Sequence, residues 1–169
     1  VSLKNWDDKT WLSSKKYIRS FNNFLLKQIK LNTNSHILDV GCGRGKIIGS
    51  FSSKLKLRNK PIGIDLINHK DKDKRINFKK TNATSFFSTN KKKFDLILIK
   101  QTIHLLKIDE IKPVLKKIKK SLKPQGKILI LTLNPHKNEL PSFALMRIRL
   151  LRSLKRDKKI LRIIYEFNP

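Results

Sequence analysis

Short apolar runs alternate with helical patterns along most of the chain. Five runs are rich in Ile, Leu or Val, and most of them are continuously apolar, as expected of parallel strands that are covered on both faces. These predicted strands are Ile37–Val40, Ile62–Leu66, Ile76–Phe78, Phe94–Ile99 and Ile128–Leu133. The spacing therefore predicts a sheet whose strands are joined by crossover connections.

Amphipathic helices are predicted between and around these strands. Apolar residues recur three or four positions apart in residues 47–55 and 108–122, as on the buried face of a helix. The same spacing predicts an N-terminal helix over residues 10–31 and a basic helix over 143–154, and residues 160–167 form either a sixth strand or a helix tail. Strands that alternate with helices predict an open α/β sheet with right-handed crossovers.

Three alternating glycines follow the first predicted strand. Asp39 lies near the end of that strand, and Gly41, Gly43 and Gly45 lead into the next helix. Glycine accepts positive φ angles and lets the backbone approach a ligand closely, while the start of a helix offers unpaired N–H groups. A dinucleotide-binding fingerprint would need a glycine at position 46, and Lys46 stands there instead, which counts against NAD.

This segment resembles the first motif of the class I S-adenosylmethionine-dependent methyltransferases, which is an acid followed by three alternating glycines. The resemblance implies that Asp39, Gly41, Gly43 and Gly45 bind the cofactor. Asp65 ends the second strand, where the family's acid holds both ribose hydroxyls of the cofactor, and a carboxylate suits a vicinal diol. Asn82 and Ala83 stand where the family often has an acid and a small residue beside the adenine. The alternatives are that Asp65 is a surface acid and that Asn82 only forms a turn.

The fourth strand resembles the family's fourth motif. The resemblance implies that Lys100 and Gln101 lie near the methionine part of the cofactor and that His104 faces the acceptor. His104 is our candidate for a general base, because the pKa of histidine lies near neutral pH; the alternative is a histidine that packs locally. Cys42 lies within the glycine turn, where small residues are required, and we assign it no catalytic role.

The resemblance implies a Rossmann-like, doubly wound, mostly parallel sheet with helices on both faces. We divide the chain into an N-terminal helical segment (1–31), a cofactor-binding core (32–135) and a basic C-terminal region (136–169). The family's sheet normally ends with antiparallel sixth and seventh strands, for which little chain remains. We therefore expect either a minimal member or a truncated chain. Trp6, Trp11 and Tyr17 form either a lid over the cofactor or part of the core.

The composition limits the possible partners and compartments. The 169 residues include 40 Lys+Arg and 12 Asp+Glu, for a formal net charge of +28. This charge is consistent with a nucleic-acid partner. Lys, Ile and Asn are also encoded by AT-rich codons, so the alternative is that the lysine excess reflects genome composition and ordinary solvated faces. One Cys excludes a disulfide framework and a multi-Cys zinc site. With no apolar run of membrane-spanning length and no signal-peptide pattern, we expect a cytoplasmic protein without a resident metal.

Three functions remain open from the sequence. The first, which we favour, is transfer of a methyl group from S-adenosylmethionine to a small-molecule acceptor, which the pattern Gln101…His104 supports. The second is an RNA methyltransferase that uses the basic surface. The third is a non-catalytic, methyltransferase-like domain that serves binding or assembly.

Overall fold

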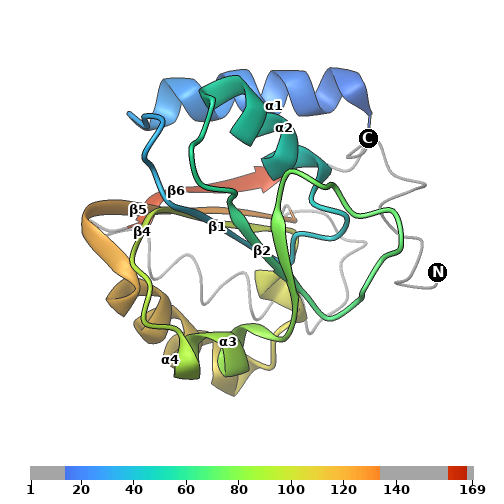
Figure 1. Ribbon diagram of the computed structural model, residues 1–169. Helices are drawn as coiled ribbons and strands as arrows, with labels where there is room; N and C mark the ends of the chain where they lie inside the picture. Colours follow the sequence, from blue (N-terminus) through green and yellow to red (C-terminus); the bar gives the residue numbers. More distant parts are fainter. Residues whose placement is uncertain (1–13, 134–159, 167–169) are drawn as a thin grey trace. The chain divides into compact units, whose positions relative to one another are not determined.

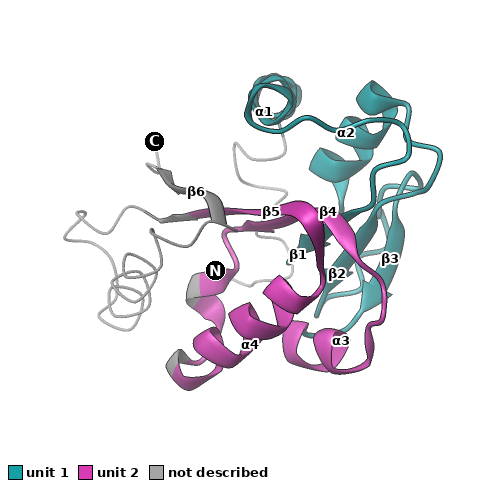
Figure 2. Cartoon of the chain, turned by 90° about the vertical axis from the view of Figure 1, so that its left-hand side faces the viewer, with its two compact units in different colours: residues 1–82 teal, residues 83–169 magenta. Residues whose placement is uncertain are grey.

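Strands and helices alternate along the chain as the sequence predicts (Figure 1). The computed structural model describes residues 14–133 and 160–166. The chain divides into two compact units, residues 1–82 and 83–169 (Figure 2). Residues 134–159, which include the predicted basic helix, lie outside the described residues, as do Trp6 and Trp11.

The first unit contains three parallel strands in the order β3-β2-β1. Its elements are α1 (Lys15–Gln28), β1 (Ile37–Val40), α2 (Lys46–Leu55), β2 (Ile62–Asp65) and β3 (Asn77–Lys80). The predicted first strand has the observed bounds, whereas the third begins one residue later than predicted and extends to Lys80. Residues 66–76 connect β2 and β3 as a loop without a helix.

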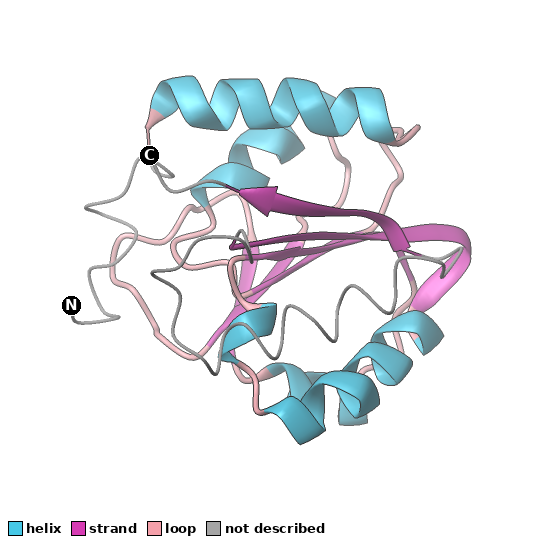
Figure 3. Ribbon diagram, turned by 180° about the vertical axis from the view of Figure 1, so that it is seen from behind, coloured by secondary structure: helices cyan, strands magenta, loops and turns pink. Residues whose placement is uncertain are grey.

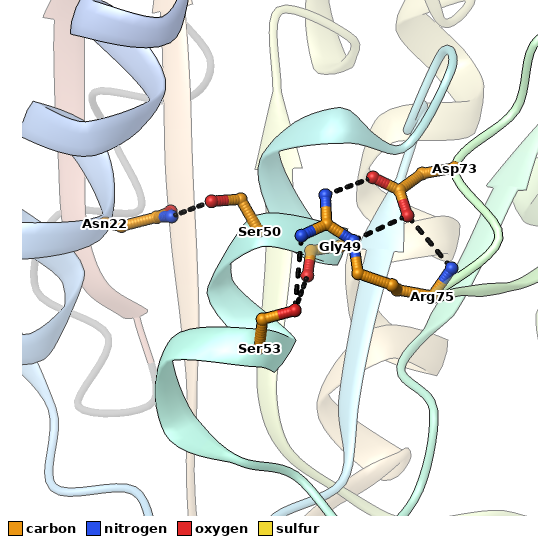
Figure 4. Close-up of polar contacts among 6 residues, drawn as sticks. All are labelled: Asn22, Gly49, Ser50, Ser53, Asp73 and Arg75. Atoms are coloured by element: carbon orange, nitrogen blue, oxygen red, sulfur yellow. Dashed lines mark hydrogen bonds and ion pairs between the residues drawn. The ribbon is translucent and has the colours of Figure 1, made fainter.

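The helices of the first unit pack against each other through a few specific contacts. Ser14 caps α1, since its side chain accepts a hydrogen bond of 3.1 Å from the N–H of Tyr17. Phe21 and Leu25 are buried, and the ring of Tyr17 stacks on that of Phe21 at a centroid distance of 5.9 Å. Asn22 of α1 donates a hydrogen bond to the hydroxyl group of Ser50 on α2 (Figure 4).

The second unit also contains parallel strands, in the order β4-β5-β6. Its elements are α3 (Ala83–Thr89), β4 (Phe94–Lys100), the short 3₁₀ helix η3 (Ile103–Leu105), α4 (Ile108–Lys120), β5 (Leu122–Leu133) and β6 (Ile160–Glu166). The helices α3 and α4 lie together on one side of these strands (Figure 3). Residues 95–100 of β4 and 128–131 of β5 are almost all buried, which explains why both strands are nearly free of alternating polar positions.

The fifth strand begins earlier than the sequence suggests. Residues 122–126 resemble a loop because they contain Pro124 and Gly126, but they belong to β5, whose register against β4 shifts between Phe94 and Leu96. A Cβ atom at Gly126 would lie 2.5 Å from the carbonyl oxygen of Phe94, so only glycine fits there. The glycine therefore allows a close pairing of two strands rather than a turn.

Residues 160–166 form a sixth strand, β6, which pairs with β5 in a parallel direction. The sequence left this segment open between a strand and a helix tail. A helix of the length and apolarity needed to cross a membrane is not found among the described residues.

Candidate functional site

The turn after β1 depends on three glycines in a left-handed conformation. Gly41, Gly43 and Gly45 have φ angles of 74°, 54° and 71°, which residues with a side chain rarely adopt. A Cβ atom at Gly45 would also lie 2.2 Å from Cδ1 of Ile76. The N–H groups of Gly41 and Cys42 both donate to the carbonyl oxygen of Ile64, at 2.8 and 3.0 Å, which ties the turn to β2.

Asp65, at the end of β2, lies against this turn. Its Oδ2 accepts a hydrogen bond of 2.8 Å from the N–H of Gly43, and its Oδ1 accepts one of 2.9 Å from the N–H of Ile67. The side chain is half-buried. Because a carboxylate has about four acceptor positions, each oxygen keeps one position for a further donor. Two backbone hydrogen bonds thus fix the orientation of an acid that can still bind a pair of hydroxyl groups.

Asp39 lies beneath the turn rather than on its surface. It is 4% exposed, and its Cα is paired in register with that of Gly63 on β2. The neighbouring Cys42 has a thiol that makes a 3.5 Å hydrogen bond to the carbonyl oxygen of Gly43. Burial raises the pKa of the Cys42 thiol well above its usual range, and the charges of Asp39 and Asp65 raise it further. The thiol stays protonated at neutral pH, so it lacks the nucleophilic form.

Asn82 and Ala83 lie where β3 leads into α3, and the boundary between the two units falls between them. Asn82 is exposed and ends the first unit, while Ala83 is 6% exposed and begins the second. The amide group of Asn82 is therefore accessible to a ligand, whereas Ala83 is too small and too buried to do more than keep space free.

Lys100, Gln101 and His104 lie together at the carboxyl end of β4, in the second unit. Lys100 is 7% exposed and Gln101 is 9% exposed. Gln101 has a φ angle of 50°, a left-handed conformation that is strained for a residue with a side chain, and its N–H donates a 2.9 Å hydrogen bond to Leu131. His104 belongs to η3. Strained backbone of this kind occurs often at functional sites, and here it coincides with a predicted site residue.

Arg44 is a buried residue of the glycine turn that the sequence did not single out. It is 5% exposed, and its Nε donates to both carboxylate oxygens of Asp71 at 2.8 Å. The carbonyl oxygen of Arg44 accepts a 2.8 Å hydrogen bond from the N–H of Asp73. Arg44 thus joins the turn to the loop that follows β2. In the sequence, only the presence of a charged residue among the glycines could have indicated that Arg44 makes this connection.

Asp73 fastens the same loop to α2 (Figure 4). Its carboxylate accepts hydrogen bonds from Arg75, including an ion pair of 2.5 Å, and Arg75 also donates to the hydroxyl group of Ser53 on α2 at 3.2 Å. A Cβ atom at Gly49 would lie 2.5 Å from Cγ of Asp73, so the helix needs glycine where the loop crosses it. The loop is held on one side by the turn and on the other by the helix.

Leu66 is a large apolar residue that lies next to the proposed site. It follows Asp65 directly and is 66% exposed. An exposed leucine beside a fixed carboxylate is consistent with contact to a ligand that has both a polar and an apolar part. Among the described residues, no group of three or more His, Cys, Asp or Glu is arranged to hold a metal ion.

Comparison with protein families gives one match over most of the chain. A family model described as a methyltransferase domain matches residues 31–166. Among curated proteins, a search gives no match.

Several solved structures have a similar fold. The plantazolicin methyltransferase BpumL, in complex with a pentazolic desmethylPZN analog and SAH, has a TM-score of 0.62 and 23% identity and covers 95% of this chain. A SAM-dependent methyltransferase from Archaeoglobus fulgidus has a TM-score of 0.58 and 19% identity over 68% of this chain and 51% of its own. A SAM-dependent methyltransferase from Geobacter sulfurreducens, in complex with S-adenosyl-L-homocysteine, has a TM-score of 0.53 and 15% identity, over 68% of this chain and 47% of its own.

These likenesses confirm the Rossmann-like α/β fold that the sequence predicts. This chain spans 62% of the length of BpumL and about half the length of the other two proteins.

Proposed function

This chain belongs to the methyltransferase domain family, and we propose that it transfers a methyl group from S-adenosylmethionine to a small-molecule acceptor. The fixed carboxylate of Asp65 is the observation that carries the proposal. Its two oxygens are oriented by Gly43 and Ile67, and each keeps an acceptor position for a hydroxyl group. The vicinal hydroxyl groups of a ribose would fit these positions.

The glycine turn, Asp39, Asn82 and Ala83, the first residue of the second unit, are further residues that we assign to the cofactor. The glycine turn brings backbone rather than side chains to the edge of the site, which leaves space for the cofactor. Asp39 is buried under this turn, and we assign it the role of holding the turn in place. We propose that the amide oxygen of Asn82 accepts a hydrogen bond from the adenine amino group. Ala83 would leave space beside the adenine.

The second unit carries the residues that we assign to the methionine part of the cofactor and to the acceptor. When bound, S-adenosylmethionine supplies an electrophilic methyl group, so the protein needs no nucleophile of its own. We assign Lys100 and Gln101 to the methionine part, because they end β4 and Gln101 holds a strained backbone there. We assign His104 the removal of the acceptor's proton, while the methyl group passes to the acceptor atom in line with the bond that breaks.

The sequence supports a small-molecule acceptor in two ways. It has the pattern Gln101…His104, and the segment after β4 lacks a motif for the methylation of nucleic-acid bases. Because the chain has a single cysteine, we place the reaction in a reducing compartment such as the cytoplasm.

Calorimetry with S-adenosylhomocysteine tests the cofactor site, and a transfer assay tests the acceptor class. We expect saturable binding with one site per chain. In the assay, a methyl-labelled cofactor is added to the small-molecule fraction and to the RNA fraction of a cell extract, and label is expected only in the first. Label only in RNA would support the RNA methyltransferase. Absence of any cofactor binding would favour the third function, a non-catalytic methyltransferase-like domain.

A further inference from the structure

Five exposed lysines lie at one end of the second unit. Lys91, Lys92 and Lys93 immediately precede β4, and Lys116 and Lys120 lie one turn apart on α4. Two contacts join these segments: the Nζ of Lys93 donates to the carbonyl oxygen of Lys120, and the N–H of Phe94 donates to that of Ser121 at 2.9 Å. We call these five residues the lysine end.

The stability of the fold explains only part of this arrangement: Lys120 lies in the last turn of α4, where a cation interacts favourably with the helix dipole. Like charges one turn apart destabilise a helix, and Lys116 and Lys120 form such a pair. The nearby acid Asp95 is already bound by Lys123 in an ion pair of 2.7 Å. In the part of the chain that the structure describes, Lys91, Lys92, Lys116 and Lys120 form no ion pair. Dissolved salt screens their mutual repulsion, and an anion bound between them lowers it further.

The lysine end is separate from the residues of the second unit that we assign to methyl transfer. Strand β4 starts beside Lys93 and ends at Lys100, and its seven residues span roughly 20 Å at 3.3 Å per residue. Lys100 and Gln101 therefore lie at the opposite end of the strand. An anion at the lysine end would therefore not contact Lys100 or Gln101, and binding there does not depend on the proposed function.

The chemistry of the lysine end favours a flexible polymer of phosphates. The exposed large apolar residues of the described chain are Leu26, Leu66 and Leu105, so none lies at the lysine end to insert into a membrane. Lysines are flexible point charges that contact phosphates without reading bases. We propose that the lysine end binds the phosphate backbone of single-stranded RNA without sequence preference. If all five lysines neutralise phosphates, the logarithm of the association constant should fall with the logarithm of salt concentration at a slope of about −3.5.

Fluorescence anisotropy with a labelled oligoribonucleotide of uniform sequence tests this proposal over a series of salt concentrations. The test variant carries Lys91→Gln, Lys92→Gln, Lys116→Gln and Lys120→Gln; Lys93 is kept because it bonds the end of α4. We expect the slope to become shallower by about 3 and the affinity at low salt to fall at least about tenfold.

A matched control carries four substitutions of exposed lysines in and after α1, with the same change of net charge: Lys15, Lys16, Lys27 and Lys30 to Gln. The control should keep most of the wild-type slope. Equal losses in both variants would show that net charge alone drives binding and would overturn the proposal. Tighter binding of anionic vesicles or polyglutamate than of RNA at equal salt would also overturn it.

Binding of S-adenosylhomocysteine, measured by calorimetry, should be unchanged in the test variant. Failure of the wild type to bind S-adenosylhomocysteine would count against the proposed function only.

Discussion

The N–H of Gly43 donates a 2.8 Å hydrogen bond to Oδ2 of Asp65, which joins the glycine turn after β1 to the end of β2. The third partner is Ile67, whose N–H binds the other carboxylate oxygen. Glycine is needed at position 43 because its φ angle of 54° directs this N–H toward the acid. Two distant segments of the sequence thus fix the orientation of the Asp65 carboxylate.

Asp65→Asn should weaken the binding of S-adenosylhomocysteine by roughly 10- to 100-fold. The amide offers one acceptor oxygen instead of two, so it cannot serve Gly43, Ile67 and a diol together, and hydrogen bonds to charged groups contribute about 1.5–3 kcal/mol. Calorimetry measures the effect. Asp109→Asn is the control, because Asp109 is an exposed acid on α4. A dissociation constant for Asp65→Asn equal to that of the control would refute the assignment of Asp65.

Gly45→Ala should destabilise the fold by about 1–3 kcal/mol or more. The new Cβ atom would sit 2.2 Å from Cδ1 of Ile76, and the φ angle of 71° is strained for alanine. Urea denaturation gives the free energy of unfolding. The double variant Gly45→Ala/Ile76→Val removes the clashing methyl group, so part of the loss should be recovered while the backbone strain persists. Equal stability of Gly45→Ala and the wild type would show that the turn has room for a side chain.

Local patterns allowed much of this fold to be predicted. The strand Ile37–Val40 is an unbroken apolar run, and Gly41, Gly43 and Gly45 have a spacing that indicates a left-handed turn, so both are readable from neighbouring residues. The left-handed conformation of Gln101 was not readable, since the residue itself does not favour it. It is imposed by the hydrogen bond to Leu131 on the adjacent strand.

Contacts between distant segments account for what the sequence did not show. Arg44 and Asp71 both resemble ordinary charged surface residues, yet Arg44 is buried and bound to Asp71. Leu122 begins a strand because Gly126 lets it pair closely with β4, although the intervening proline suggests a loop. Each of these features depends on which segments meet in the fold, which hydrophobic spacing alone does not specify.

The ion pair between Arg44 and Asp71 should make stability depend on pH in the acid range. Partial desolvation raises the pKa of Asp71, but the hydrogen bond and the charge of Arg44 outweigh this and hold the pKa below its ordinary value of 3.8. A lowered pKa means that the stabilisation is present above 3.8 and is lost as the pH falls through the pKa of the folded state.

Urea denaturation of the wild type and of Asp71→Asn from pH 7 to pH 2 measures this contribution. The wild type should be more stable at pH 7, and the difference should shrink steadily below about pH 3.8. Between Arg44→Gln and Arg44→Gln/Asp71→Asn, the acid-dependent difference should be much smaller, because the hydrogen bond and charge of Arg44 are gone while the charge of Lys46 and a backbone hydrogen bond still lower the pKa of Asp71. A difference that stays constant down to pH 2 would show that the carboxylate charge is not what stabilises the wild type.

The Cys42 thiol should react slowly with alkylating reagents in the folded protein. Burial and then the charges of Asp39 and Asp65 raise its pKa, whereas an ordinary cysteine is about one quarter thiolate at pH 8. Iodoacetamide labelling followed by mass spectrometry should show a rate at least about tenfold lower in buffer than in urea. Asp65→Asn removes one of the two charges and should speed the labelling, while Asp109→Asn should not. Equal rates with and without urea would contradict the partial burial of this thiol within the glycine turn.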